Sequence, residues 1–159
     1  MPLTVFERWT DYGEEMLLKA ALGQASAASS VYCHLFKSPT TDPADETPTL
    51  VEADFDGYGA VGFVWQTVSD PTAAGLWQAL SNIVCTFLRG AGATSNTVYG
   101  YYLTCNVSGW DADEPVYYRF FNDGQSLTPK TMATESVDQI TIIPRVGLIG
   151  LEDVVCPEA

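Results

Sequence analysis

The apolar residues near the start of the chain recur at the spacing of an α-helix. Residues 11–22 place apolar side chains at three- and four-residue intervals, which predicts an amphipathic helix with one apolar face: Met16, Leu17, Leu18, Ala20, Ala21 and Leu22. Asp11 and Glu14 have the spacing of a capping box, and Gly23 can adopt the left-handed conformation that ends a helix. A helix this short needs a packing partner, so we expect its apolar face to contact another surface.

From residue 31 onwards the apolar residues alternate with the period of β-strands. Residues 31–36 are apolar on both faces, which predicts a strand that is covered on both sides. Further strands are predicted at residues 60–68, 82–88, 97–105, 116–121 and 139–143. This series of short strands favours a mainly β fold, a single β-sandwich or barrel of about seven antiparallel strands with one short N-terminal helix.

We expect one domain over residues 1–159, made of the helix at 11–22, a β domain at 31–144 and a C-terminal extension at 145–159. The extension contains an apolar run. An apolar helix face and an apolar extension are elements that a neighbouring subunit can cover. We therefore predict a homo-oligomer with intersubunit contacts at Leu17, Leu18, Ala21, Leu148 and Leu151.

The charge of the chain narrows the choice of partner. Its 20 acidic and 7 basic residues give a net charge of −13, which repels phosphate and argues against nucleic acid as a partner. No apolar run approaches the length of about 20 residues that spans a bilayer, so no membrane partner is expected. Nine carboxylates gather at residues 42–56 and 111–114. An acidic loop surface on an apolar β core suits a protein that binds another protein.

The sequence lacks the motifs of familiar catalytic sites: no nucleophile elbow, phosphate-binding loop or dinucleotide fingerprint occurs. His34 is the only histidine, and no residue near it in the sequence marks an orienting partner. Four cysteines lack the close pairs of a zinc site and are expected to be reduced thiols: Cys33, Cys85, Cys105 and Cys156. The acidic loops do not match a calcium loop, so a solvated acidic surface is favoured over bound Ca²⁺. We predict a protein that is not an enzyme and holds no cofactor or metal.

Several blocks of the chain follow a recognisable order. They are Phe-Glu-Arg-Trp at residues 6–9, Gly-Glu-Glu-Met-Leu-Leu at 13–18, Val-Tyr-Cys-His-Leu-Phe-Lys at 31–37, Glu-Ala-Asp-Phe-Asp-Gly-Tyr at 52–58, Thr-Val-Tyr-Gly-Tyr-Tyr at 97–102 and Ile-Thr-Ile-Ile-Pro at 140–144. This order resembles a family of small virion proteins of tailed bacteriophages. In that family an aromatic-Arg-Phe element precedes the closing strand, and Tyr-Tyr-Arg-Phe-Phe at 117–121 occupies that place. The extension after Pro144 departs from the family pattern.

The resemblance implies a structural role in the virion, after assembly in the host cytoplasm. We expect a capsid decoration or cement protein that binds the head surface, with the major capsid protein or another virion protein as its partner. Two alternatives remain open, namely a tail, fibre or neck component and a receptor- or glycan-binding module. In the second alternative an aromatic ring and nearby carboxylates would contact the sugar, with Trp110, Asp111 and Asp113 as candidates.

Overall fold

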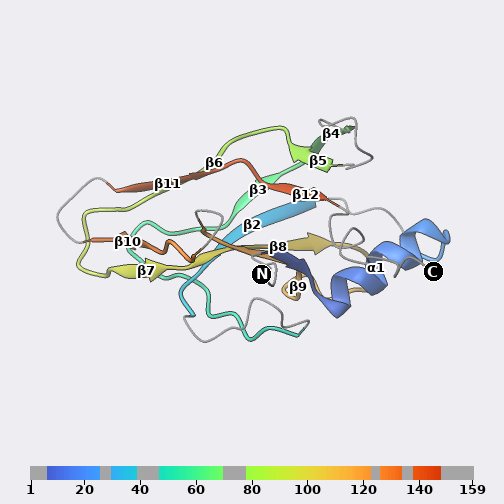
Figure 1. Ribbon diagram of the computed structural model, residues 1–159, viewed down its shortest axis with the longest axis horizontal. Helices are drawn as coiled ribbons and strands as arrows, with labels where there is room; N and C mark the ends of the chain where they lie inside the picture. The colour runs from blue at the N-terminus through green and yellow to red at the C-terminus, as the bar shows by residue number, and fades with distance from the viewer. Residues whose placement is uncertain are drawn as a thin grey trace, which may run out of the picture.

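A five-stranded antiparallel sheet forms the centre of the molecule (Figure 1). Its strands lie in the order β1 (Glu7–Trp9), β9 (Pro115–Phe120), β8 (Gly100–Asn106), β2 (Ser30–Phe36) and β3 (Val61–Phe63). The computed structural model describes residues 7–25, 30–38, 47–69, 78–122, 126–133 and 138–147. β1 pairs with β9, so residues ahead of the predicted β domain also belong to the sheet.

Three smaller antiparallel sheets complete the described strands. They pair β6 (Cys85–Leu88) with β11 (Gln139–Ile142), β7 (Asn96–Val98) with β10 (Lys130–Met132), and β5 (Gln78–Ser81) with both β4 (Trp65–Ser69) and β12 (Arg145–Gly147). In Figure 1 the β6–β11 pair and β12 lie along one side of β2 and β8. The predicted mainly β, antiparallel fold is confirmed, and the described strands do not close into a barrel.

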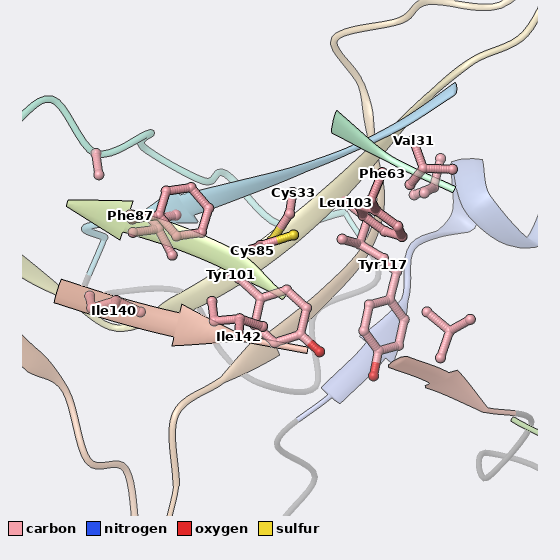
Figure 2. Close-up of a cluster of buried hydrophobic side chains, with 14 of the residues drawn as sticks. Val31, Cys33, Phe63, Cys85, Phe87, Tyr101, Leu103, Tyr117, Ile140 and Ile142 are labelled. Carbon is pink, nitrogen blue, oxygen red and sulfur yellow. The ribbon is translucent and has the colours of Figure 1, made fainter. Parts of the chain in front are cut away.

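The main core fills the space between the central sheet and the β6–β11 pair (Figure 2). Alternate residues of β2 point into it, and Cys33 and Leu35 are fully buried there. The opposite face of the sheet carries a second apolar cluster, formed by Phe36, Tyr102, Tyr118 and Phe120. The prediction that the strand at residues 31–36 is covered on both sides is confirmed only in part, because on this second face Phe36 is buried but His34 is half-buried and Tyr32 is 39% exposed.

The described residues hold twelve short strands, more than the predicted number, and β1, β5, β10 and β12 lie outside the predicted strand ranges. In addition, the predicted strand 60–68 divides at Val64 into β3 and β4, and the predicted strand 97–105 divides at Tyr99 into β7 and β8, where the chain changes its partner strand. Just after the second of these points, a side chain at Gly100 would place its Cβ 2.1 Å from the Arg119 carbonyl oxygen. Only glycine fits at this crossing. The start of the predicted extension also forms a strand, since β12 pairs with β5.

The helix α1 (Asp11–Ala21) packs against β9. Its N-cap is Thr10, not the predicted Asp11: the Thr10 hydroxyl accepts a hydrogen bond from the Gly13 N–H (3.0 Å) and donates one to the Pro115 carbonyl (2.6 Å). Gly23 has φ +68° and ends the helix as predicted. Within the described part of the chain, α1 is too short to cross a membrane.

Candidate functional site

The helix α1 presents three leucines to solvent, which we call the leucine stripe: Leu17, Leu18 and Leu22. Leu17 is 40% exposed, and Leu18 and Leu22 are each 63% exposed. Gly13 and Met16 are buried on the side opposite Leu18 and Leu22, and Leu17 lies at the edge of that buried side, one turn after Gly13. The predicted contact residues Leu17, Leu18 and Ala21 are therefore all on the surface, whereas the predicted contacts Leu148 and Leu151 lie outside the described residues.

The stripe is carried by a helix that the rest of the fold holds in place. The backbone N–H of Thr10 donates to the carbonyl of Val116 in β9 (3.1 Å). A Cβ at Gly13 would lie 2.0 Å from that same carbonyl oxygen, which shows how closely the helix approaches the strand. The leucines are thus displayed by a fixed element, and a partner would lose little conformational entropy in binding them.

The loop at residues 109–114 also contacts α1, through Tyr12 and Lys19. The rings of Tyr12 and Trp110 meet edge to face with centroids 5.0 Å apart, and the Tyr12 hydroxyl donates to the Asp111 carbonyl (3.0 Å). The Lys19 ammonium lies 4.9 Å from the Trp110 ring centroid and also pairs with Glu15 (2.6 Å). These contacts hold the half-buried Trp110 between the loop and the helix.

The three candidate glycan-binding residues lie in one loop, and the contacts described for them are within this loop and with α1. Lys19 already lies over the Trp110 ring. One Asp111 carboxylate oxygen accepts the N–H of Asp113 (3.0 Å), which stabilises the turn. Both carboxylates remain exposed to solvent. Burial raises the pKa of Tyr12, and the neighbouring carboxylate of Asp111 adds to this effect.

Carboxylates dominate the charge around the leucine stripe. Asp11, Glu14 and Glu15 lie on α1, and helical spacing places Glu14 and Glu15 one turn from Leu18. Three further acidic residues lie in the adjoining loop at 111–114. Lys19 is the single basic residue of α1. The stripe is therefore an apolar surface with an acidic border.

The carboxylates of the acidic segment at residues 52–56 bind side chains and backbone groups from other parts of the chain. Asp54 pairs with Lys37 (2.6 Å) and accepts a hydrogen bond from the Asn96 side chain (2.9 Å), and both contacts lower the pKa of Asp54. Asp56 accepts the N–H of Gly92 (2.7 Å). Among the described residues no cluster of three His, Cys, Asp or Glu side chains could hold a metal ion. The remaining acidic residues of the predicted loop, at 42–46, lie outside the described residues.

His34 has an orienting partner that the sequence did not indicate. Its Nδ1 lies 2.7 Å from a Glu52 carboxylate oxygen, and its Nε2 lies 3.1 Å from the Thr104 hydroxyl. The Tyr58 hydroxyl donates to the same Glu52 oxygen (2.8 Å), and the His34 ring stacks on Tyr102. An acid–histidine–hydroxyl chain of this kind can activate a nucleophile, but Thr104 is only 2% exposed and no substrate can reach it. The group therefore acts as a polar link between β2, β8 and the 47–58 segment.

The described cysteines are free thiols in the core, as expected. Cys33 and Cys85 face each other between the two sheets and share a hydrogen bond (Figure 2). Burial raises the pKa of Cys33 and raises the pKa of Cys105 to about 11, whereas the hydrogen bond with Cys33 lowers the pKa of Cys85. All three thiols are buried, and inaccessible thiols are poor nucleophiles and poor metal ligands. Cys156 lies outside the described residues.

The leucine stripe is the candidate site that these contacts leave open to a partner. Its position on a braced helix and its acidic border define the chemistry that a partner must match. Comparisons with family models, with curated proteins and with solved structures find no match for this chain.

Proposed function

We propose that this protein is a structural protein of a bacteriophage virion, a decoration or cement protein that binds the capsid surface. The observation that carries the proposal is the leucine stripe, an apolar surface displayed on a helix that β9 and the 109–114 loop hold rigid. The order of sequence blocks, which resembles small virion proteins of tailed phages, supports the same role. A cement protein acts by burying surface across subunits and requires no catalytic group.

The exposed fractions of the stripe set the scale of the contact. Burying a leucine side chain completely stabilises a complex by about 1.5–3 kcal/mol, so covering the stripe contributes about 2.5–5 kcal/mol per copy. This gain is modest once the cost of association is subtracted. A decoration protein compensates through repetition, because each copy strengthens the same shell at many equivalent positions.

The acidic border specifies the partner further. A capsid surface that receives the stripe should offer an apolar groove with Lys or Arg at its rim, facing Glu14 and Glu15. Such pairs guide encounter more than they tighten the complex, and salt screens them. The proposed partner is the major capsid protein or another virion protein with such a groove.

Binding to particles that lack this chain tests the proposal. We compare the wild type with Leu18→Ser, which removes one of the two most exposed leucines of the stripe, and with the matched control Leu88→Ser, whose leucine is 53% exposed on β6. Co-sedimentation should show Leu18→Ser binding roughly five- to thirtyfold more weakly, the equivalent of about 1–2 kcal/mol. The control should bind like the wild type. Equal binding by all three proteins would contradict the role of the stripe.

The number of copies in a particle separates this proposal from the alternatives. A decoration protein occupies the head in hundreds of copies, whereas a tail, fibre or neck component is present in a handful. A glycan-binding role would require Lys19 to leave the Trp110 ring, since a sugar stacks on an open aromatic face. We therefore place decoration of the head first.

A further inference from the structure

Two cysteines from different sheets meet in the main core. Cys33 lies on β2 of the central sheet and Cys85 is the first residue of β6, and both side chains are fully buried. Each occupies an inward position of its strand, two residues before another buried side chain, Leu35 on β2 and Phe87 on β6. The two thiols therefore approach each other from opposite sides of the core (Figure 2).

The two thiols act on each other directly. They share a hydrogen bond, which together with burial raises the pKa of Cys33 and which lowers the pKa of Cys85. Cys105 differs from both, since burial alone raises its pKa and no second thiol of the described residues acts on it. Cys33 and Cys85 are thus a pair, whereas Cys105 is a single buried thiol.

A bond between the two sulfur atoms would join parts of the fold that share no backbone hydrogen bonds. In the described part of the chain β2 pairs with β8 and β3, and β6 pairs with β11. About 50 residues separate the two cysteines, so a cross-link would close a long loop and restrict the unfolded chain strongly. Buried disulfides that join two packed sheets in this way occur in β-sandwich domains.

We propose that Cys33 and Cys85 are a redox pair that a peroxide converts into a disulfide between the central sheet and the β6–β11 pair. The Cys85 thiol attacks one peroxide oxygen and the O–O bond breaks, which gives a sulfenic acid on Cys85 and releases one water. The Cys33 sulfur then displaces the sulfenic oxygen, the S–S bond forms, and a second water leaves with the Cys33 proton. Two thiols are oxidised by two electrons, and hydrogen peroxide is reduced to two waters.

The position of the pair determines how this oxidation proceeds. Both sulfurs are buried, so the first step requires a local opening of the core. β6 and β11 are four-residue strands in a two-stranded sheet, and such a pair opens more readily than the centre of a five-stranded sheet. Hydrogen peroxide needs a smaller opening than a bulkier alkylating reagent. Once Cys85 is oxidised, Cys33 is already beside it, so closure of the disulfide should outpace further oxidation.

The pair would respond to the environment of the chain. Two thiols persist where the medium is reducing, as in a cytoplasm, and the disulfide forms where the medium is oxidising. The cross-link would then hold the two sides of the core together. This chemistry is independent of the proposed virion role, because it needs only the purified chain and an oxidant.

Two full-length variants with two cysteines each test the proposal. Cys105→Ala/Cys156→Ala keeps the pair, whereas Cys33→Ala/Cys156→Ala keeps Cys85 and Cys105, which do not affect each other's pKa. Each folded protein is incubated with hydrogen peroxide, treated with catalase, and unfolded in iodoacetamide to block the remaining thiols. Peptide mass spectrometry without reduction locates disulfides and sulfinic acids. Thermal unfolding is measured before oxidation, after it, and after addition of dithiothreitol.

The expected product of Cys105→Ala/Cys156→Ala is the Cys33–Cys85 disulfide, with a Tm raised by roughly 8–16 °C that dithiothreitol restores to its starting value. Cys33→Ala/Cys156→Ala should form no intramolecular disulfide and should show no rise in Tm. Circular dichroism checks that both variants are folded, and Cys85→Ala/Cys156→Ala is a second control if the first is not.

Three results would overturn the proposal. The first is a paired variant that remains reduced or accumulates sulfinic acid in place of the disulfide. The second is a disulfide that forms as fast in the control, because closure would then not depend on the contact between Cys33 and Cys85. The third is a Cys33–Cys85 disulfide that leaves the Tm unchanged or lowers it, because the bond would then not hold the core together.

Discussion

Replacing Gly13 by alanine should loosen α1 from the sheet, although alanine is the better helix former. In an isolated helix the change is worth about 1 kcal/mol in favour of alanine. Here the new Cβ would lie 2.0 Å from the Val116 carbonyl oxygen and 2.8 Å from the carbonyl carbon. These are backbone atoms of β9, which pairs with β1 and with β8, and Val116 lies at the register shift of the β8–β9 pair. Because β9 is held by strands on both sides, we expect the helix to move more than the strand.

The contacts that anchor α1 set the size of the effect. Displacement breaks the hydrogen bonds from the Thr10 N–H to Val116 and from the Thr10 hydroxyl to Pro115, at about 1 kcal/mol each. Exposing the buried Met16 side chain costs about 1.5–3 kcal/mol more. After subtracting the gain in helix propensity, Gly13→Ala should destabilise the docked helix by about 2.5–4 kcal/mol.

Hydrogen exchange measured residue by residue is the assay, with urea denaturation alongside it. The amides of α1 should lose protection in Gly13→Ala, whereas those of β8 in the centre of the sheet should change much less. Ala20→Gly is the matched control, because it lowers helix propensity by about 1 kcal/mol at an exposed position without approaching β9. If Gly13→Ala raises stability and α1 keeps its protection, the close packing of helix on strand is refuted.

Three further predictions follow from single contacts. Gly100→Ala should destabilise the whole fold by more than about 3 kcal/mol in urea denaturation, because the new Cβ meets the Arg119 carbonyl in the centre of the sheet. The pKa of Asp54 is lower in the folded protein than the unfolded-state value of about 3.9. Its contribution to stability is therefore present above the unfolded-state pKa and is lost as the pH falls through the folded-state pKa. Lys37→Met removes the main cause of this shift, so the decline of Tm at acidic pH should become flatter. Iodoacetamide at about pH 8.5, where a free cysteine is half ionised, should label the core thiols only after unfolding, as peptide mass spectrometry can show for Cys33, Cys85 and Cys105.

Local patterns in the sequence predicted the helix and several strands, whereas the three- and four-residue strands β1, β5, β10 and β12 were not predicted. The period of the apolar residues identifies α1, and Gly23 marks its end because the left-handed conformation is a local property. The two apolar faces of β2 indicate the apolar clusters on both faces of the sheet, although Tyr32 stays exposed on the second face. These features depend on residues close together in the chain.

The sequence-based predictions are wrong or incomplete where contacts between residues far apart in the chain determine the structure. Thr10 became the N-cap because its hydroxyl also reaches Pro115, far along the chain. His34 contacts Glu52 and Thr104 only because the fold brings these distant residues next to β2. The predicted strands 60–68 and 97–105 divide at Val64 and Tyr99 because the chain changes its partner strand at these residues. β3 pairs with β2 whereas β4 pairs with β5, and β7 pairs with β10 whereas β8 pairs with β2 and β9. None of these contacts leaves a signal in the local sequence.

The candidate site was likewise predicted in part from local sequence and in part only from the folded structure. Helical periodicity predicted an apolar face, but it could not tell which part of that face packs on β9 and which remains exposed. The structure buries Gly13 and Met16 and leaves Leu17 and Leu18 outside.

The most direct test of the proposed role is a cryo-electron microscopy reconstruction of an intact phage particle that carries this chain. We expect many symmetric copies on the head, each with α1 against a capsid subunit and with Leu17, Leu18 and Leu22 buried in the contact. A chain found in a few copies at the tail, or one bound to the head with α1 facing solvent, would contradict it.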